Sequence, residues 1–291
     1  MREGYVTVIG GKIWYKIYTN NNDQQNKAPI IILHGGPGTP HNYLLNLQDL
    51  SQHRSVIFYD QLGCGNSLIE NADKDLWTIS RFVLELHDLI NALGINQFHL
   101  FGHSWGGSLA VEYALLHSKH VRSLILASPV LSVPLWLEDT KLLLKQLPES
   151  TQQIINQHER KGTTESPEYQ IAKNEFNNLL SRIHPDPEEL VYSLTHSNRD
   201  VYQTMWGPSE FTVTGNLKNF DRINDLVNIK NPILITCGRF DEASPLSMQK
   251  AQKKCKNAKL VIFENSAHVA HIEEPNKYLH TLEMFLADVE S

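Results

Sequence analysis

The sequence predicts an α/β fold, with a mostly parallel central sheet and a mainly helical segment inserted into it. The first observation behind this prediction is a set of short apolar runs without polar alternation, as expected for strands buried on both faces of a parallel sheet. The second is a helical pattern between such runs, because strands that alternate with helices are typical of this fold class. The apolar runs lie at residues 30–33, 55–59, 98–101, 124–127, 232–237 and 259–263.

An N-terminal hairpin precedes the first of these runs. Residues 5–8 and 13–17 are rich in β-branched and aromatic side chains, and they flank a turn at Gly10-Gly11. Two such segments around a glycine-containing turn predict a pair of antiparallel strands. Residues 20–27 are polar throughout and are predicted to form a loop.

Helices are predicted where apolar residues recur every three to four positions. Such a pattern covers residues 78–93, and Gly94 stands where a C-terminal cap is expected. A second helix is predicted over residues 107–114, and a last amphipathic one over residues 278–289. The apolar face of the first helix consists of Ile79, Phe82, Val83, Leu86 and Ile90.

The strand pattern ends near residue 128 and resumes only at residue 232. The residues in between contain helical patterns and polar loops. We therefore expect a core made of residues 1–129 and 221–291, with residues 130–220 inserted as a mainly helical cap, or lid. The length of 291 residues suits one large domain of this kind.

Composition narrows the classes of partner. The formal net charge of −6 and the lack of a dense Lys/Arg run disfavour nucleic acid. The most apolar stretch, residues 124–137, is interrupted by two prolines and is too short to span a bilayer. The first residues lack the apolar core of a secretory signal, so neither secretion nor membrane association is expected.

The three cysteines, Cys64, Cys237 and Cys255, are odd in number, far apart and without CxxC spacing. A disulfide framework and a zinc site are therefore not expected. Disulfides are rare in reducing compartments, so this cysteine usage predicts a cytoplasmic location.

A candidate nucleophile, Ser104, lies in the segment Gly-His-Ser-Trp-Gly at residues 102–106. The GxSxG pattern is weak alone, and an ordinary strand-to-helix turn would also satisfy it. Here, however, a predicted strand leads in and a predicted helix leads out. This arrangement raises a serine to the carboxyl edge of the sheet in the α/β-hydrolase fold, with glycines where the sharp turn leaves no room for Cβ atoms. We therefore predict the α/β-hydrolase fold, with Ser104 as nucleophile.

A serine hydroxyl needs a base to attack a carbonyl, and the base needs an orienting carboxylate. The α/β-hydrolase fold places these groups in the chain order Ser, Asp or Glu, His, each on a loop after a late strand. Asp241 follows the fifth apolar run and His268 follows the sixth, so they are the predicted partners of Ser104. His271 is an alternative base, and Glu242 is an alternative to Asp241.

The oxyanion that forms on attack needs preorganised N–H donors. The backbone amide of Trp105, directly after the nucleophile, is the first expected donor, and the loop after an early strand should supply the second. That loop is His-Gly-Gly-Pro-Gly at residues 34–38, where Gly36 is the predicted donor. Asp60 and Gln61 are expected to support this loop. The chemistry requires no metal and no organic cofactor.

Three motifs together resemble the proline iminopeptidases, also called prolyl aminopeptidases, a family of serine peptidases. They are HGGPG at residues 34–38, YDQLGCGNS at residues 59–67 and GHSWGG at residues 102–107. A fourth segment, WGPSEFTVTG at residues 206–215, resembles the matching part of the archaeal tricorn-interacting aminopeptidase factor, a member of this family. The resemblance extends over nearly the whole chain.

The resemblance implies a substrate class. In this family a glutamate in the cap and a glutamate beside the triad aspartate hold the free amino terminus of the substrate, and the matching residues here are Glu210 and Glu242. Two partly desolvated carboxylates attract an ammonium group and are left unpaired by a blocked terminus. The implied activity is release of an N-terminal residue, proline or another apolar one, from short peptides through an acyl-enzyme. The alternatives are an esterase or amidase on the same fold, and a ligand-binding relative without activity.

Overall fold

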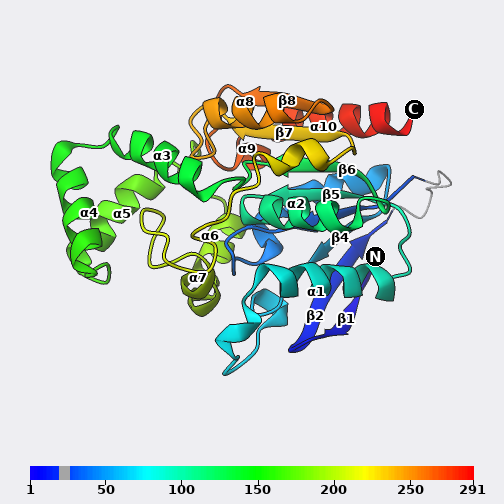
Figure 1. Ribbon diagram of the computed structural model, residues 1–291, viewed down its shortest axis with the longest axis horizontal. Helices are drawn as coiled ribbons and strands as arrows, with labels where there is room; N and C mark the ends of the chain where they lie inside the picture. Colours follow the sequence, from blue (N-terminus) through cyan, green and yellow to red (C-terminus); the bar gives the residue numbers. More distant parts are fainter. Residues whose placement is uncertain (20–26) are drawn as a thin grey trace.

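The computed structural model describes residues 1–19 and 27–291, so the loop predicted at 20–27 lies outside the described residues except for Lys27. The centre of the molecule is an eight-stranded sheet in the order β1-β2-β4-β3-β5-β6-β7-β8 (Figure 1). Its strands are β1 (Arg2–Val8), β2 (Gly11–Tyr18), β3 (Ile30–Leu33), β4 (Val56–Tyr59), β5 (Phe98–His103), β6 (Val121–Ala127), β7 (Ile233–Gly238) and β8 (Ala258–Phe263). Strands β3 to β8 are parallel, and the β1–β2 hairpin joins them through antiparallel pairing of β2 with β4. The predicted hairpin and mostly parallel sheet are confirmed.

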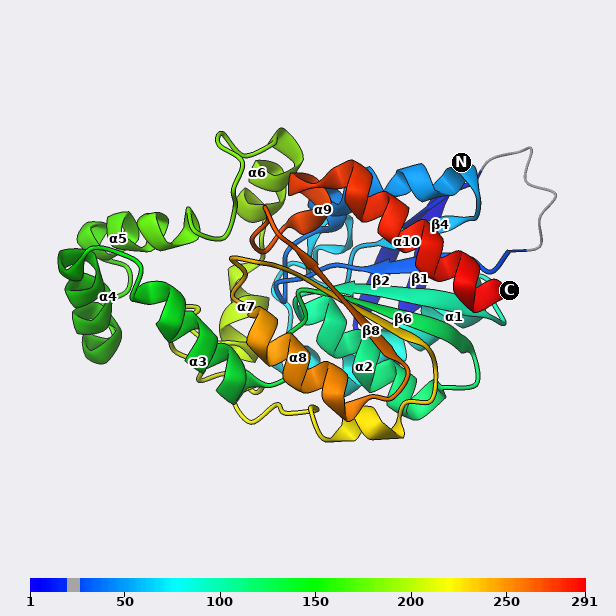
Figure 2. The ribbon, with the colours of Figure 1, turned by 90° about the horizontal axis from the view of Figure 1, so that it is seen from above.

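Helices cover both faces of this sheet (Figure 2). One face carries α1 (Ile79–Ala92), α2 (Trp105–His117) and α8 (Pro245–Lys254), and the other carries the 3-10 helix η1 (His41–Gln52) and α10 (Pro275–Glu290). Alternate residues of β3 serve the two faces: Ile31 and Leu33 pack with α1 and α2, whereas Ile30 and Ile32 pack with η1 and α10. Both faces are therefore apolar, which explains why the strands lack polar alternation.

Helix boundaries follow local signals. The hydroxyl of Thr78 accepts a hydrogen bond from the amide of Arg81 and so caps the start of α1. Gly94 follows the end of α1 with a φ of +67°, as predicted for a glycine that stops a helix. Strand β6 begins three residues before the predicted apolar run, because the exposed Arg122 interrupts the apolar pattern at its start.

Residues 130–220 contain helices and no strand. The helices are α3 (Val133–Leu144), α4 (Glu149–Lys161), α5 (Pro167–Asn177), α6 (Glu188–Thr195) and α7 (Arg199–Met205). Helices α3, α4 and α5 project beyond the sheet and share a small apolar cluster of their own (Figures 1 and 2). The helical character predicted for this segment is confirmed, while the division into a core and a cap stays a prediction.

None of the helices in residues 1–19 and 27–291 is long and apolar enough to cross a membrane. Cys64, Cys237 and Cys255 are all buried and free.

Candidate active site

Ser104 occupies a strained turn between β5 and α2, near the middle of the sheet. Its backbone has φ 54° and ψ −120°, a conformation that residues with a side chain rarely adopt. A Cβ atom on Gly102 would collide with the carbonyl of Gly106, and one on Gly106 would collide with the carbonyl of Leu33. The strand–turn–helix geometry predicted for GxSxG is therefore present, and α2 points its N-terminus at Ser104.

His268 pairs with Asp241. The Nδ1 atom of His268 lies 2.8 Å from Oδ1 of Asp241. The carboxylate is buried and is held in turn by the backbone amides of Ala243, at 2.9 Å, and Gly238, at 3.3 Å. The alternative base, His271, instead places Nε2 3.1 Å from the carbonyl of Tyr43. The structure thus joins Asp241 to His268 and not to His271.

The electrostatic surroundings favour the charged form of His268. Burial alone would lower the pKa of this imidazole, but the carboxylates of Asp241, Glu242 and Glu210 outweigh it and raise the pKa to about 9. Burial lowers the pKa of His271 to about 3, because the hydrogen bond to the carbonyl of Tyr43 offsets only part of the burial and the neighbouring His268 lowers the pKa further. A cation that paired with these carboxylates would reverse part of the shift in His268 and free the imidazole to act as a base.

Within the described residues no hydrogen bond joins the hydroxyl of Ser104 to His268. The Nε2 atom of His268 lies 3.7 Å from Oε1 of Glu242. The link between the two loops is made by the neighbouring His103, whose Nε2 lies 2.9 Å from the carbonyl oxygen of His268. Catalytic hydrogen bonds are often long in ligand-free enzymes and shorten when substrate binds.

Glu242 and Glu210 come from segments far apart in sequence but act on the same histidine. Glu242 is 3% exposed, and its Oε2 atom has no hydrogen-bond partner in the part of the chain that the structure describes. Burial raises the pKa of Glu242 well above its usual range; His268 opposes this shift, and Glu210 adds to it. Burial also raises the pKa of Glu210, although its carboxylate accepts a hydrogen bond from the hydroxyl of Tyr202. Two carboxyl groups in such surroundings gain from a cation between them.

The glycine-rich loop lies against the nucleophile. A Cβ atom on Gly35 would approach Cβ of Ser104 to 3.1 Å. The amide of Gly35 donates to the hydroxyl of Tyr43 at 2.8 Å, so this amide does not serve as an oxyanion donor. Gly36 has a φ of +108°, and a Cβ there would lie 2.6 Å from the amide nitrogen of Gly38. Among the described residues the amides of Gly36 and Trp105 have no backbone acceptor, as an oxyanion site requires.

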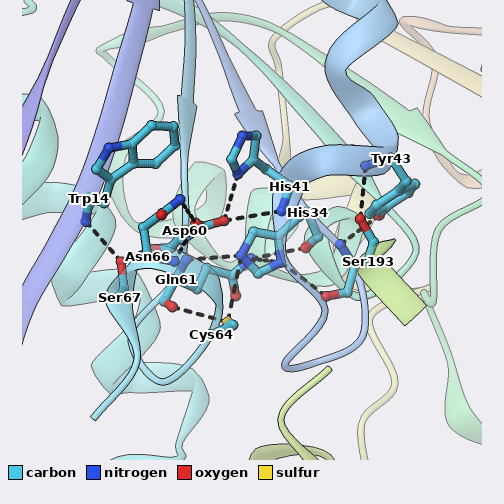
Figure 3. A network of polar contacts seen from close by, with 11 residues as sticks. Trp14, His34, His41, Tyr43, Asp60, Gln61, Cys64, Asn66, Ser67 and Ser193 are labelled. Atoms are coloured by element: carbon cyan, nitrogen blue, oxygen red, sulfur yellow. Dashed lines mark hydrogen bonds and ion pairs between the residues drawn. The ribbon is translucent and has the colours of Figure 1, made fainter. Parts of the chain in front are cut away.

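Gln61, just after β4, supports this loop as expected from the sequence, whereas Asp60 bonds to residues that flank it (Figure 3). The backbone amide of Gln61 donates to Nε2 of His34 at 2.9 Å. The side-chain nitrogen of Gln61 donates to the backbone carbonyl of His34, also at 2.9 Å. Asp60 accepts hydrogen bonds from His41 and Asn66, which fixes both sides of its carboxylate. The loop is thus held by a buried polar network.

Aromatic side chains enclose the site from the helical segment. The ring of Trp136 on α3 lies 5.8 Å from that of His268 and 5.9 Å from that of Trp206. Phe211 packs on Phe176 within the small cluster of α3, α4 and α5. Sequence reasoning missed Trp136, because nothing in its own neighbourhood signals a contact with a loop more than a hundred residues away.

In residues 1–19 and 27–291 no group of three or more His, Cys, Asp or Glu side chains is arranged to hold a metal ion.

Comparison with known proteins places these features in a family. The profile described as "alpha/beta hydrolase fold" matches residues 28–275. The proline iminopeptidase of Heyndrickxia coagulans is 44% identical over 289 residues, which cover 99% of each chain. That of Saccharolobus solfataricus is 38% identical, and the match covers 100% of this chain and 94% of the relative.

A solved structure agrees with the sequence relatives. The crystal structure of proline iminopeptidase from Mycobacterium smegmatis superposes with a TM-score of 0.91 at 34% identity, and the match covers 99% of this chain and 98% of that one. The likeness extends over both the sheet and the helical segment, since almost no residue falls outside it. The chain therefore belongs to the proline iminopeptidase family of α/β-hydrolase-fold proteins.

Proposed function

We propose that this protein is a serine aminopeptidase that releases N-terminal proline, and other apolar N-terminal residues, from short peptides. The observation that carries the proposal is the position of two glutamates, the buried Glu242 and the half-buried Glu210, beside a His268–Asp241 pair at the strained Ser104 turn. The names of the full-length relatives support the same activity.

The reaction proceeds through an acyl-enzyme. His268 takes the proton of Ser104 while the hydroxyl oxygen attacks the first peptide carbonyl. The amides of Gly36 and Trp105 donate to the oxyanion, and the N-terminus of α2 adds its favourable dipole. His268 then gives the proton to the departing amine, which leaves an aminoacyl ester on Ser104. Water hydrolyses this ester with His268 again as the base.

The two glutamates select for a free amino terminus. The secondary ammonium of an N-terminal proline carries two N–H donors, which match one carboxylate each from Glu242 and Glu210. Binding of this cation favours the ionised form of both groups, whose pKa values burial raises. The same cation lowers the pKa of His268, so the substrate itself converts the histidine to its basic form.

Residues 130–220 act in this proposal as the cap, which carries Glu210 over the nucleophile. Helices α3 and α7 bring Trp136 and Tyr202 to the same place. A cap that reaches across the site leaves room for the end of a chain and not for an internal peptide bond. Short peptides with a free N-terminus, in the cytoplasm, are therefore the proposed substrates.

The test compares proline p-nitroanilide with its N-acetylated form and with short acyl esters. The free amine should be cleaved on the order of a hundredfold faster than the acetylated amide, since acetylation leaves both glutamates unpaired. The Ser104→Ala variant measures the background. Equal cleavage of free and acetylated amides, or ester cleavage without amide cleavage, would favour the esterase alternative.

A further inference from the structure

Tyr43 and His103 belong neither to the predicted triad nor to the predicted oxyanion donors, yet they contact the segments that carry both. Tyr43 lies in η1 and is 5% exposed, and His103 precedes Ser104 and is 2% exposed. The hydroxyl of Tyr43 lies 2.8 Å from the amide of Gly35 and 2.9 Å from Nδ1 of His103. The Nε2 atom of His103 lies 2.9 Å from the carbonyl oxygen of His268. These contacts form one continuous chain.

The direction of every hydrogen bond in this chain follows from its two ends. The amide of Gly35 can only donate, so the oxygen of Tyr43 accepts from it. The carbonyl of His268 can only accept, so Nε2 of His103 carries the hydrogen. A neutral imidazole then has an acceptor at Nδ1, and the single hydrogen of the Tyr43 hydroxyl points there. No member of the chain is left with a conflicting role.

The surroundings keep both side chains neutral. Burial lowers the pKa of His103 well below its usual range, and the neighbouring His268 and His271 lower it further. Burial also raises the pKa of Tyr43. Protonation of His103 would put a hydrogen on Nδ1 as well, so the hydroxyl of Tyr43 could no longer donate to it. The chain therefore keeps one direction in neutral solution.

The three segments joined in this way have to stay in register during catalysis. Gly35 directly precedes the predicted donor Gly36, His103 directly precedes Ser104, and the chain ends on the backbone of His268. No hydrogen bond joins the side chains of Ser104 and His268 in the described residues, so the chain through His103 is the polar connection between their loops. A displacement of about 1 Å between reacting groups can cost on the order of a hundredfold in rate.

We propose that Tyr43 and His103 are positioning residues for acyl transfer, which hold the oxyanion loop, the nucleophile and the base in register through this hydrogen-bonded chain. The proposal rests on the proposed function only in the choice of reaction. Neither side chain contacts Glu242 or Glu210 through a hydrogen bond in the described residues, so binding of the substrate ammonium does not depend on them. Loss of the chain should therefore lower kcat and leave KM nearly unchanged.

The first experiment removes the hydroxyl of Tyr43 with Tyr43→Phe. The matched control is Tyr113→Phe. Tyr113 is also buried and also contacts a histidine, with its hydroxyl 3.3 Å from Nδ1 of His87, but it lies on α2 beyond the site. With proline p-nitroanilide, Tyr43→Phe should lower kcat about 10- to 100-fold and change KM less than about twofold. Equal kcat values for the two variants would overturn the proposal.

A double-mutant cycle tests whether the two residues act as one unit. Tyr43→Phe should cost less than about twofold in a His103→Leu background, because the chain is already broken there. His103→Gln, whose amide still has a donor for the carbonyl of His268, should retain more activity than His103→Leu. Effects that simply multiply, or equal losses in the two His103 variants, would contradict a shared positioning role.

A second readout separates this proposal from the proposed function. The rate at which a fluorophosphonate labels Ser104 depends on the nucleophile, base and oxyanion donors, and the reagent carries no ammonium group that the glutamates would have to bind. Tyr43→Phe and His103→Leu should slow this labelling, measured on protein shown to be folded by circular dichroism, even if proline amides prove not to be substrates. Labelling at the rate of Tyr113→Phe in both variants would overturn the proposal, whatever the substrate is.

Discussion

The side-chain oxygen of Gln61 accepts a hydrogen bond from the indole N–H of Trp105 at 2.9 Å. The nitrogen of the same side chain donates to the carbonyl of His34 (Figure 3). Trp105 supplies one predicted oxyanion donor, and His34 begins the loop that contains the other, Gly36. The side-chain amide of Gln61 therefore holds both segments that supply the predicted oxyanion donors.

Replacing Gln61 by leucine should leave buried polar groups of His34 and Trp105 without partners. We expect the free energy of unfolding to fall by about 1–3 kcal/mol and kcat to fall about tenfold, with KM nearly unchanged. Denaturant unfolding and steady-state kinetics measure both effects. Gln152→Leu is the control, because Gln152 lies on the remote helix α4 and its side chain donates to the carbonyl of Leu147, just before that helix. Normal kcat in a destabilised Gln61→Leu protein would limit Gln61 to a structural role.

Replacing Ser104 by alanine should remove the nucleophile and keep the turn. We expect turnover of proline p-nitroanilide to fall by at least about a thousandfold. The thermal unfolding midpoint should stay near that of the wild type, since alanine adds no atoms to this crowded turn. If the folded variant kept turnover within about tenfold of the wild type, Ser104 could not be the nucleophile.

Replacing Glu242 by glutamine should weaken binding and stabilise the fold. The carboxylate is buried, one of its oxygens has no hydrogen-bond partner among the described residues, and burial raises its pKa, so its ionised form is unfavourable in the folded state at neutral and higher pH. We expect KM for free-amine substrates to rise at least about tenfold, while the unfolding temperature rises slightly. The control Glu264→Gln changes an exposed carboxylate that pairs with Arg239. Unchanged KM in Glu242→Gln would exclude Glu242 from the ammonium site.

The pH dependence of Ser104 labelling should report the ionisation of His268. A base must be neutral to act, so labelling by a fluorophosphonate should rise with pH through the pKa of His268. Because neighbouring carboxylates raise that pKa to about 9, the midpoint should lie well above the ordinary value of about 6.5. Glu242→Gln removes a negative neighbour and should move the midpoint to lower pH. A midpoint at the ordinary value in both proteins would show that the carboxylates do not act on His268.

The parts of the fold that could be predicted from sequence are those in which one physical constraint acts locally. Strand β3 is recognisable because burial on both faces requires four apolar residues in succession. The pairing of Asp241 with His268 could be inferred because β7 and β8 are parallel, and their carboxyl ends therefore meet at one edge of the sheet. The 3-10 helix η1 was not predicted, since it has neither a side-chain cap nor an acidic residue in its first turn.

Other site contacts depend on distances that no local pattern encodes. His103 occupies a variable position of GxSxG, and its partners Tyr43 and His268 lie 60 and 165 residues away along the chain. The predicted support of the glycine loop by Gln61 was correct, but its bond to the ring of Trp105 depends on how β4 and α2 lie in space. Such contacts emerge only when the sheet order brings distant segments together.

The carboxylates of Asp241, Glu242 and Glu210 around His268 have a consequence for the end of each catalytic cycle. On the proposed function, the glutamates bind the α-ammonium group of the first residue. Hydrolysis does not alter this group, so the liberated amino acid still carries it. What changes is the other end, where a neutral acyl group becomes a carboxylate among Asp241, Glu242 and Glu210. Repulsion between like charges would then favour release of the freed amino acid, so the same carboxylates that bind the peptide would also promote departure of the product.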